Sequence, residues 1–330
     1  MIEDKIVKLL MDKGLGSVRL PISPVPGGFL HRMYKVDTET GSFAVKHLNP
    51  NIMRRPEAMD NFKAAEALER MLDTSDIPIV PALEFDGCKM QLVDGDYFYI
   101  FKWQEGAISE WNNISAEQCR IAGSIQGKIH AIASMQVDKP MPEFSCIDWD
   151  DLLEKAASNA PTLEGLIKEN KEMFIYAEKE LNSARANLPG IESIVDEDMD
   201  PKNVMWHEGH PKVIDLECLE RGNPVSSAIQ LSLQWAGATI CDLDFSKMKA
   251  FFDGYLDAYD SGLSDYSSVF GLAYTWVEWL EYNIRRALGH CADEGEREIG
   301  LSEVELSVAR IRYLKDMEGQ ILQNLKCWFG

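Results

Sequence analysis

The stretch VDEDMDPKNVMWHEGHPKVIDLECLERGNP, residues 195–224, decides which fold and which chemistry this sequence can support. Asp198 and Asn203 lie five residues apart in it, and Asp215 follows twelve residues later, after a hairpin turn signal at Glu208-Gly209. This arrangement suits phosphoryl transfer, because one carboxylate can face an attacking hydroxyl while an amide oxygen and a second carboxylate hold Mg²⁺ on the phosphates. The spacing alone recurs by chance, so it needs support from the rest of the chain.

Residues that could complete a phosphate site occur upstream. Gly27 and Gly28 precede the first strand of an expected hairpin, and a glycine turn lets the backbone approach a phosphate. Lys46 lies on the second strand, from which its ammonium group can reach the phosphates. Such a lysine needs a carboxylate partner, for which Glu66 on the following helix is the first candidate and Glu69 the second.

The first hundred residues are rich in strand patterns. Alternating apolar residues over 32–48 predict a β-hairpin, and Asp-Gly pairs at 86–87 and 94–95 predict further antiparallel turns. Between them, apolar residues at helical spacing predict one helix over 62–72. The order is therefore hairpin, helix and more antiparallel strands.

After Trp103 the pattern becomes mostly helical. A capping box at Ser115–Gln118 opens the first of these helices, and only residues 194–224 interrupt the helical pattern for long. We therefore expect an α+β fold with a small antiparallel β-rich lobe, residues 1–103, and a larger, mainly helical lobe, residues 104–330.

Taken in order, these segments resemble the aminoglycoside phosphotransferase and choline kinase family, the small-molecule branch of the protein-kinase-like fold. The matching segments are GG (27–28), AVK (44–46), AAEALE (64–69), FKWQEG (101–106), GKIH (127–130), DMDPKN (198–203), IDLE (214–217) and GNP (222–224). They span nearly the whole chain. The resemblance implies a two-lobed, kinase-like phosphotransferase that phosphorylates a hydroxyl group of a small molecule, with ATP or GTP as donor and Mg²⁺ as cofactor. The protein-kinase motifs H-R-D, D-F-G and A-P-E are missing, which argues against a protein kinase.

The expected roles follow from the motif and the resemblance together. Asp198 is expected to orient the substrate hydroxyl and take its proton, and Asn203 and Asp215 are expected to hold Mg²⁺. Lys46, held by Glu66, is expected to bind the α- and β-phosphates.

Two further positions depend on the resemblance. The segment Lys102, Trp103 and Gln104 corresponds to the hinge between the lobes, whose backbone meets the nucleobase. The family usually has a histidine two residues before the catalytic aspartate, where it braces the loop by hydrogen bonding, and this sequence has Asp196 there. Asp196 is expected to take over that role by accepting a backbone N–H.

One glycine-rich run is interpreted as structural. The run from Gly123 to Ile129 is one residue short of a P-loop, lacks its hydroxyl residue and lies within a helical pattern. His130, on the same helix, is expected to be a hydrogen-bonded core residue rather than a general base.

Charge and cysteine content exclude several classes of protein. The net charge of −21 disfavours binding to nucleic acid or to an anionic membrane, because both rest on lysine and arginine. No apolar run is long enough to span a membrane. The seven cysteines form no C-x-x-C pair, so we expect a reduced, cytoplasmic protein with buried thiols. We also expect either a monomer or a homodimer.

The distribution of charge favours a cationic acceptor. Residues 1–103 have a net charge of −2 and residues 104–330 one of −19, and such a field attracts cations. Glu217, Glu278 and Glu281 are candidates for binding the amine of a substrate. Trp276, Trp279 and Tyr282 either pack in the core or line the substrate pocket.

Three functions remain open at this point. The acceptor could be an aminoglycoside, which would make the protein an antibiotic-resistance kinase. It could instead be a metabolic amino alcohol or sugar, such as choline, ethanolamine or an amino sugar. The third alternative is a nucleotide-binding regulator with weak catalysis, suggested by the missing histidine.

Overall fold

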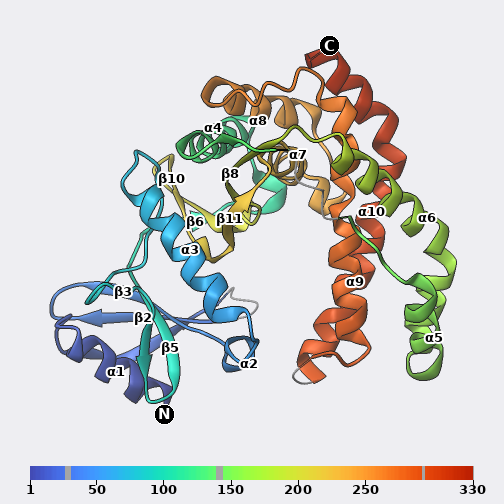
Figure 1. Ribbon diagram of the computed structural model, residues 1–330. Helices are drawn as coiled ribbons and strands as arrows, with labels where there is room; N and C mark the ends of the chain where they lie inside the picture. The colour runs from blue at the N-terminus through green and yellow to red at the C-terminus, as the bar shows by residue number, and fades with distance from the viewer. Residues whose placement is uncertain (27–30, 139–143, 292–293, 330) are drawn as a thin grey trace. The chain divides into compact units, whose positions relative to one another are not determined.

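The computed structural model of the chain describes residues 1–26, 31–138, 144–291 and 294–329 (Figure 1). They form two units, which we call the N-terminal unit (Met1–Ile108 with Lys202–Glu220) and the C-terminal unit (Ser109–Pro201 with Arg221–Gly330). Residues 202–220 belong to the N-terminal unit because strand β6 pairs with β9 there and because Ile79 bridges Val213 in parallel. The division therefore differs from an expected boundary after Trp103.

The N-terminal unit contains the predicted antiparallel strands. Its elements are α1 (Ile2–Asp12), β1 (Val18–Val25), β2 (Arg32–Thr38), β3 (Ser42–His47), α2 (Pro50–Met53), α3 (Ala58–Asp73), β4 (Gln91–Val93), β5 (Asp96–Lys102), β6 (Ala107–Ile108), β9 (Val204–His207), β10 (His210–Val213) and the 3₁₀ helix η3 (Leu216–Cys218). Five strands form one antiparallel sheet in the order β1-β2-β3-β5-β4. Figure 1 labels β2, β3 and β5 of this sheet. The hairpin predicted over 32–48 is thus confirmed.

Alternation along the strands gives this sheet two different faces. Val45, Phe98 and Ile100 point to one side, where they form a core with the buried face of α1. Lys46 and Tyr99 are direct cross-strand neighbours in the β3–β5 pair, and they point to the other side because successive side chains of a strand alternate. Tyr99 contacts Phe62 of α3 there. Lys46 therefore lies on the face that α3 covers.

Three hairpin turns have the backbone conformation that their sequences predict. Asp86, Asp94 and Glu208 adopt positive φ angles of 53°, 46° and 50°, and each precedes a glycine that also has positive φ. Two consecutive residues in this region make a type I′ turn, whose twist matches that of antiparallel strands. The turn signals were sufficient because this conformation depends on local sterics alone.

The C-terminal unit is mainly helical, as expected. Its elements are α4 (Ala116–Ile132), β7 (Met135–Gln136), α5 (Trp149–Asn159), α6 (Pro161–Ala186), β8 (Ile191–Asp196), β11 (Leu219–Gly222, which begins in the N-terminal unit), α7 (Pro224–Trp235), α8 (Phe245–Ala258), η5 (Tyr266–Thr275), α9 (Trp276–Ala287) and α10 (Glu294–Phe329). The capping box is formed, since the Ser115 side chain accepts from the Gln118 N–H and the Gln118 side chain from the Ser115 N–H. Figure 1 shows α9 and α10 side by side. None of the described helices has an apolar stretch long enough to cross a bilayer.

The glycines of the rejected P-loop pattern lie inside α4, where they allow a very close approach to α8. A Cβ atom built on Gly123 would lie 2.0 Å from the carbonyl oxygen of Phe251. In return, a Cβ on Gly254 of α8 would lie 1.9 Å from the carbonyl oxygen of Arg120. The two helices are therefore in backbone contact, and the glycines serve packing.

This contact makes Gly123→Ala strongly destabilising. We expect the free energy of unfolding to fall by about 3 kcal/mol, because the methyl group can be accommodated only if the helices move apart. Urea unfolding measures the change. Gly165→Ala in α6 is the matched control, since a Cβ there meets no atom within 4 Å and alanine favours a helix. Equal effects of the two substitutions would contradict the packing argument.

His130 lies in the core and is hydrogen-bonded to other buried polar groups. Its side chain is fully buried and hydrogen-bonds Gln126 at 2.8 Å and the Tyr255 hydroxyl at 2.9 Å. Burial lowers the pKa of His130 to about 3, so the ring is neutral near pH 7. The prediction of a core histidine is confirmed.

The expectation for the cysteines holds only in part. In the part of the chain that the structure describes, none of the seven cysteines is in a disulfide, as predicted. The prediction that they are buried is wrong for six of them, because only Cys119 is buried while Cys88, Cys146, Cys218 and Cys327 are exposed. Cys88 directly follows the Asp86-Gly87 turn and Cys327 lies in the last turn of α10, and both positions are open to solvent.

Candidate active site

The hairpin formed by β9 and β10 brings two of the predicted site residues together. Its register pairs Val204 with Val213, and the Ile214 N–H donates to the carbonyl oxygen of Asn203 at 2.9 Å. Asp215 is the next residue, so Asn203 and Asp215 lie at the open end of the same hairpin. The twelve-residue spacing in the sequence is the length that this hairpin requires.

Asp215 turns the chain so that two carboxylates face one lysine. It has φ 61° and ψ 58°, a left-handed conformation that is uncommon outside glycine, and the 3₁₀ helix η3 follows it. The Lys46 Nζ donates to Asp215 Oδ1 at 2.6 Å and also to Glu217 Oε2. In this ion-pair cluster, Lys46 is 6% exposed and therefore largely removed from water, whereas the side chains of Glu217 and Asp215 are 19% and 36% exposed.

The charges in this cluster stabilise one another. Burial alone would lower the pKa of Lys46, but Asp215 and Glu217 raise it above the ordinary value. Burial alone would raise the pKa of Glu217, but the hydrogen bond from His31 and the charge of Lys46 lower it to about 2. Lys46 is therefore a cation and Glu217 an anion throughout the neutral pH range.

The expected pairing of Lys46 with Glu66 is not formed between these two described residues. Glu66 Oε1 instead accepts from the Tyr99 hydroxyl at 2.9 Å and from the Met90 N–H at 3.2 Å. Burial beside Glu66 raises the pKa of Tyr99, so its hydroxyl stays protonated and able to donate. The expected partner was wrong because Tyr99, next to Lys46 on the sheet, occupies the Glu66 carboxylate. Glu69, the second candidate, is paired with Lys89 at 2.8 Å.

The other predicted nucleotide-binding residues lie at or just after the end of β5, or outside the described residues. Lys102 ends β5, and the Trp103 N–H donates to the carbonyl oxygen of Ser42 at 3.0 Å. The Trp103 ring carries the Lys35 ammonium group 4.3 Å from its centroid, and Gln104 Nε2 donates to the Lys102 carbonyl oxygen at 3.2 Å. Gly27 and Gly28 lie outside the described residues.

The loop that carries Asp198 belongs to the C-terminal unit and follows β8. Asp196, the last residue of β8, is 1% exposed, and its Oδ1 accepts the Asp198 N–H at 3.1 Å. Met199 is held by its carbonyl oxygen, which accepts from the Trp235 indole N–H at 2.9 Å. These contacts give the loop a defined backbone on both sides of Asp198.

A short chain of side chains connects this loop to the start of α9. Gln230 Nε2 donates to Glu197 Oε1 at 3.2 Å, and Thr275 Oγ1 donates to Gln230 Oε1 at 3.1 Å. Thr275 directly precedes Trp276, the first residue of α9. The helix that carries Glu278 and Glu281 is thus anchored to the loop that carries Asp198.

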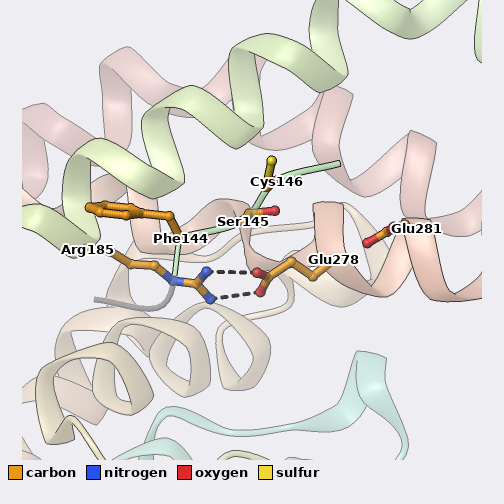
Figure 2. A pocket seen from close by; sticks show the side chains of 6 residues that line it. All are labelled: Phe144, Ser145, Cys146, Arg185, Glu278 and Glu281. Atoms are coloured by element: carbon orange, nitrogen blue, oxygen red, sulfur yellow. Dashed lines mark hydrogen bonds and ion pairs between the residues drawn. The ribbon is translucent and has the colours of Figure 1, made fainter. Parts of the chain in front are cut away.

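Two of the predicted substrate residues line one cavity. Glu278 and Glu281 of α9 face a cavity of about 390 Å³ together with Arg185 of α6 and the segment Phe144–Cys146. Figure 2 shows the guanidinium group of Arg185 facing both carboxylate oxygens of Glu278, at 2.7 and 2.8 Å. Glu281 also accepts from Arg285, at 2.6 Å. Both acids are therefore paired with arginines. The pairing of Arg185 with Glu278 could not be predicted from sequence spacing.

Glu217, the third predicted substrate residue, is described within its own unit. It belongs to the N-terminal unit, and its carboxylate is occupied by Lys46 and His31. In this structure the Glu217 carboxylate is a counter-charge of the buried Lys46, and its binding of substrate stays a prediction. Two aromatic residues of α9, Trp279 and Tyr282, are 41% and 39% exposed. They stack on each other and are not core residues.

The donor set in the N-terminal unit fits the magnesium ion that the resemblance implies. Asn203 and Asp215 offer an amide oxygen and a carboxylate, the hard oxygen ligands that Mg²⁺ takes, usually with water and substrate phosphates completing its shell. Among the described residues, no group of three His, Cys, Asp or Glu side chains makes a self-sufficient metal site.

Comparison with known proteins agrees with this fold. A spectinomycin phosphotransferase, solved with ADP and spectinomycin, has a TM-score of 0.64 at 12% identity, over 95% of this chain and 94% of that chain. A Plasmodium vivax ethanolamine kinase has a TM-score of 0.60 at 12% identity, over 93% of this chain and 87% of that one. An amicoumacin kinase, solved with AMP-PNP and Ca²⁺, has a TM-score of 0.59 at 14% identity, over 92% and 93%. No curated protein sequence matches the chain significantly.

The sequence itself matches a family profile over most of its length. The profile of the phosphotransferase enzyme family covers residues 21–266, which include Lys46, Asp198, Asn203 and Asp215. The fold is the mixed α/β architecture of the kinase-like neighbours, with an antiparallel sheet first and helices after it. The chain therefore belongs to the phosphotransferase enzyme family.

Proposed function

We propose that this phosphotransferase transfers the γ-phosphate of ATP or GTP to a hydroxyl group of a small, amine-bearing molecule. The observation that carries the proposal is the buried Lys46 held between Asp215 and Glu217, at the hairpin end where Asn203 also lies. A nucleotide requires both features, because a buried cation can bind its phosphates and oxygen donors can bind its metal ion.

In this proposal each residue has a defined task. Lys46 binds the α- and β-phosphates as a point charge, and Asn203 and Asp215 hold Mg²⁺, which neutralises charge on the phosphates when bound. Asp198 orients the acceptor hydroxyl and accepts its proton, while Asp196 keeps the loop in place through the Asp198 N–H. The backbone of residues 102–104 and that of Gly27 and Gly28 are proposed to contact the nucleotide. Catalysis then consists of positioning and charge neutralisation.

The cavity at α9 supports an acceptor of modest charge. Glu278 is neutralised by Arg185 and Glu281 is close to Arg285, so the cavity is not an uncompensated anionic site. The stacked Trp279 and Tyr282 add an exposed aromatic surface on the same helix, and aromatic faces attract ammonium groups. We therefore place an acceptor with one or two amines in this cavity in preference to a polycation.

A turnover assay tests the proposal. The protein is incubated with Mg²⁺ and either ATP or GTP and with a panel that contains choline, ethanolamine, amino sugars and aminoglycosides, and the products are identified by mass spectrometry. We expect one compound of the panel to gain a single phosphate on a hydroxyl group, with ADP or GDP formed in equal amount. Binding of Mg·ATP without phosphorylation of any panel member would contradict the amine-bearing acceptor.

A resistance kinase is the second candidate, supported by the similarity to the spectinomycin and amicoumacin enzymes. Expression in a sensitive host with aminoglycoside challenge distinguishes the candidates. Raised resistance would favour this alternative, whereas unchanged susceptibility with abundant folded protein would favour a metabolic acceptor.

A further inference from the structure

His31 forms two hydrogen bonds that connect Asn49, the N-cap of α2, to the lysine cluster. Its Nδ1 accepts the Asn49 N–H at 2.9 Å, and its Nε2 lies 3.2 Å from Glu217 Oε1. A nitrogen that accepts a backbone N–H carries no proton, so the proton of the neutral ring is on Nε2, which donates to Glu217. The side chain is 5% exposed, and Phe62 of α3 packs beside the ring. The geometry of the imidazole is thus determined from both ends.

Glu217 is the carboxylate that connects Lys46 to His31. Of its two oxygens, Oε1 accepts from His31 and Oε2 from Lys46. Asp215, the other partner of Lys46, has a second proposed task as a metal ligand. Glu66, on the helix, is occupied by Tyr99 and Met90. Glu217 is therefore the carboxylate that can remain with Lys46 when a nucleotide is bound.

We infer that His31 is a positioning residue for nucleotide binding: its Nε2–H holds Glu217 against Lys46, so that Glu217, and not Glu66, is the lasting counter-charge of the phosphate-binding lysine. This inference rests on the proposed function of Lys46. It differs from a purely structural role, in which His31 would serve only to satisfy the Asn49 N–H.

Two substitutions of His31 separate the roles, because each amide side chain reproduces one ring nitrogen. In His31→Gln the amide nitrogen can take the place of Nε2 and donate to Glu217. In His31→Asn the amide oxygen can take the place of Nδ1 and accept from Asn49, but the side chain is too short to reach Glu217. Positioning predicts that glutamine preserves nucleotide binding and asparagine does not, and a structural role predicts the reverse.

The experiment uses the full chain. Calorimetry measures Mg·ATP binding, and steady-state kinetics measure KM and kcat for ATP with the acceptor that the protein is found to phosphorylate. We expect His31→Asn and Glu217→Gln each to raise Kd and KM by about tenfold with a smaller change in kcat, because the lost bond involves a charged group in the ground state. His31→Gln should stay within about threefold of the wild type. The double variant His31→Asn/Glu217→Gln should bind no more weakly than Glu217→Gln alone, because the two side chains act as one unit.

His47→Asn is the matched control. His47 also bonds a carboxylate, Asp96 at 3.1 Å, and lies on β3 next to Lys46, but its side chain points to the other face of the sheet. Its substitution should leave Kd and KM for Mg·ATP unchanged. An equal effect of His47→Asn and His31→Asn would indicate general damage to the sheet and overturn the inference.

Other outcomes are equally decisive. Wild-type binding by His31→Asn, loss of binding in His31→Gln alone, or additive effects in the double variant would each show that His31 does not act through Glu217. If His31→Asn does not fold, as judged by thermal unfolding, Glu217→Gln decides: a KM within about threefold of wild type overturns the inference. Failure of the wild-type protein itself to bind Mg·ATP would overturn the proposed function, which is a different result from any change among the variants.

Discussion

Asp198→Ala is expected to lower kcat by about three orders of magnitude while the Kd for Mg·ATP stays within about twofold of the wild type. The carboxylate is proposed to orient the acceptor hydroxyl and take its proton, and alanine can do neither. The loop should keep its backbone, since the bond to Asp196 uses the Asp198 N–H and not its side chain. Single-turnover kinetics with the acceptor that the protein is found to phosphorylate measure the loss of rate, and calorimetry measures the Kd for Mg·ATP.

Glu197→Gln is the control for Asp198→Ala. It removes a negative charge from the neighbouring residue but keeps an oxygen that can accept from Gln230. We expect kcat to remain within about threefold of the wild-type value, because this carboxylate has no proposed contact with the hydroxyl. A loss as large as that of Asp198→Ala would mean that the loop responds to its net charge. An active Asp198→Ala protein would falsify the assignment of the catalytic residue.

Lys46→Met is expected to lower kcat/KM for ATP by about two orders of magnitude or more, because it removes the cation proposed to bind the phosphates. It should also reduce the free energy of unfolding by about 2 kcal/mol, since Asp215 and Glu217 lose their counter-charge while retaining some access to solvent. Steady-state kinetics and urea unfolding measure the two effects separately.

Two further variants show that these effects have different causes. Lys46→Met/Glu217→Gln should regain part of the stability, because a neutral amide needs no counter-charge, but none of the activity. Lys89→Met is the matched control: Lys89 is 2% exposed and paired with Glu69, so its loss should cost stability while KM for ATP stays within about twofold. Recovery of activity in the double variant would contradict the role of Lys46.

Local sequence was sufficient for the elements and for much of the site. The Asp-Gly turns, the capping box at Ser115–Gln118 and the β9–β10 hairpin were predictable because each depends on residues a few positions apart. The grouping of Asn203 with Asp215 was predictable for the same reason, since one hairpin joins them. The matching order of motifs then indicated the family without any knowledge of the fold.

Contacts between distant segments were beyond the reach of the sequence. Glu66 was a reasonable partner for Lys46 by position, but the register of β3 and β5 places Tyr99 beside Lys46, and the Tyr99 hydroxyl takes that carboxylate. The pairing of Arg185 with Glu278 likewise joins two helices 93 residues apart. No pattern in the sequence specifies which of several charged residues will meet.

The amino-acid sequence by itself thus determined the secondary structure and the order of the motifs, because turns, caps and helical periodicity are set by short-range sterics and hydrogen bonds. It also predicted Lys46, Asp198, Asn203 and Asp215 as candidate site residues. Only the tertiary structure decided that Glu217 and His31 surround Lys46, that Arg185 neutralises Glu278 and that most cysteines are exposed. Partners of a buried charge are selected by desolvation, which depends on how distant segments pack.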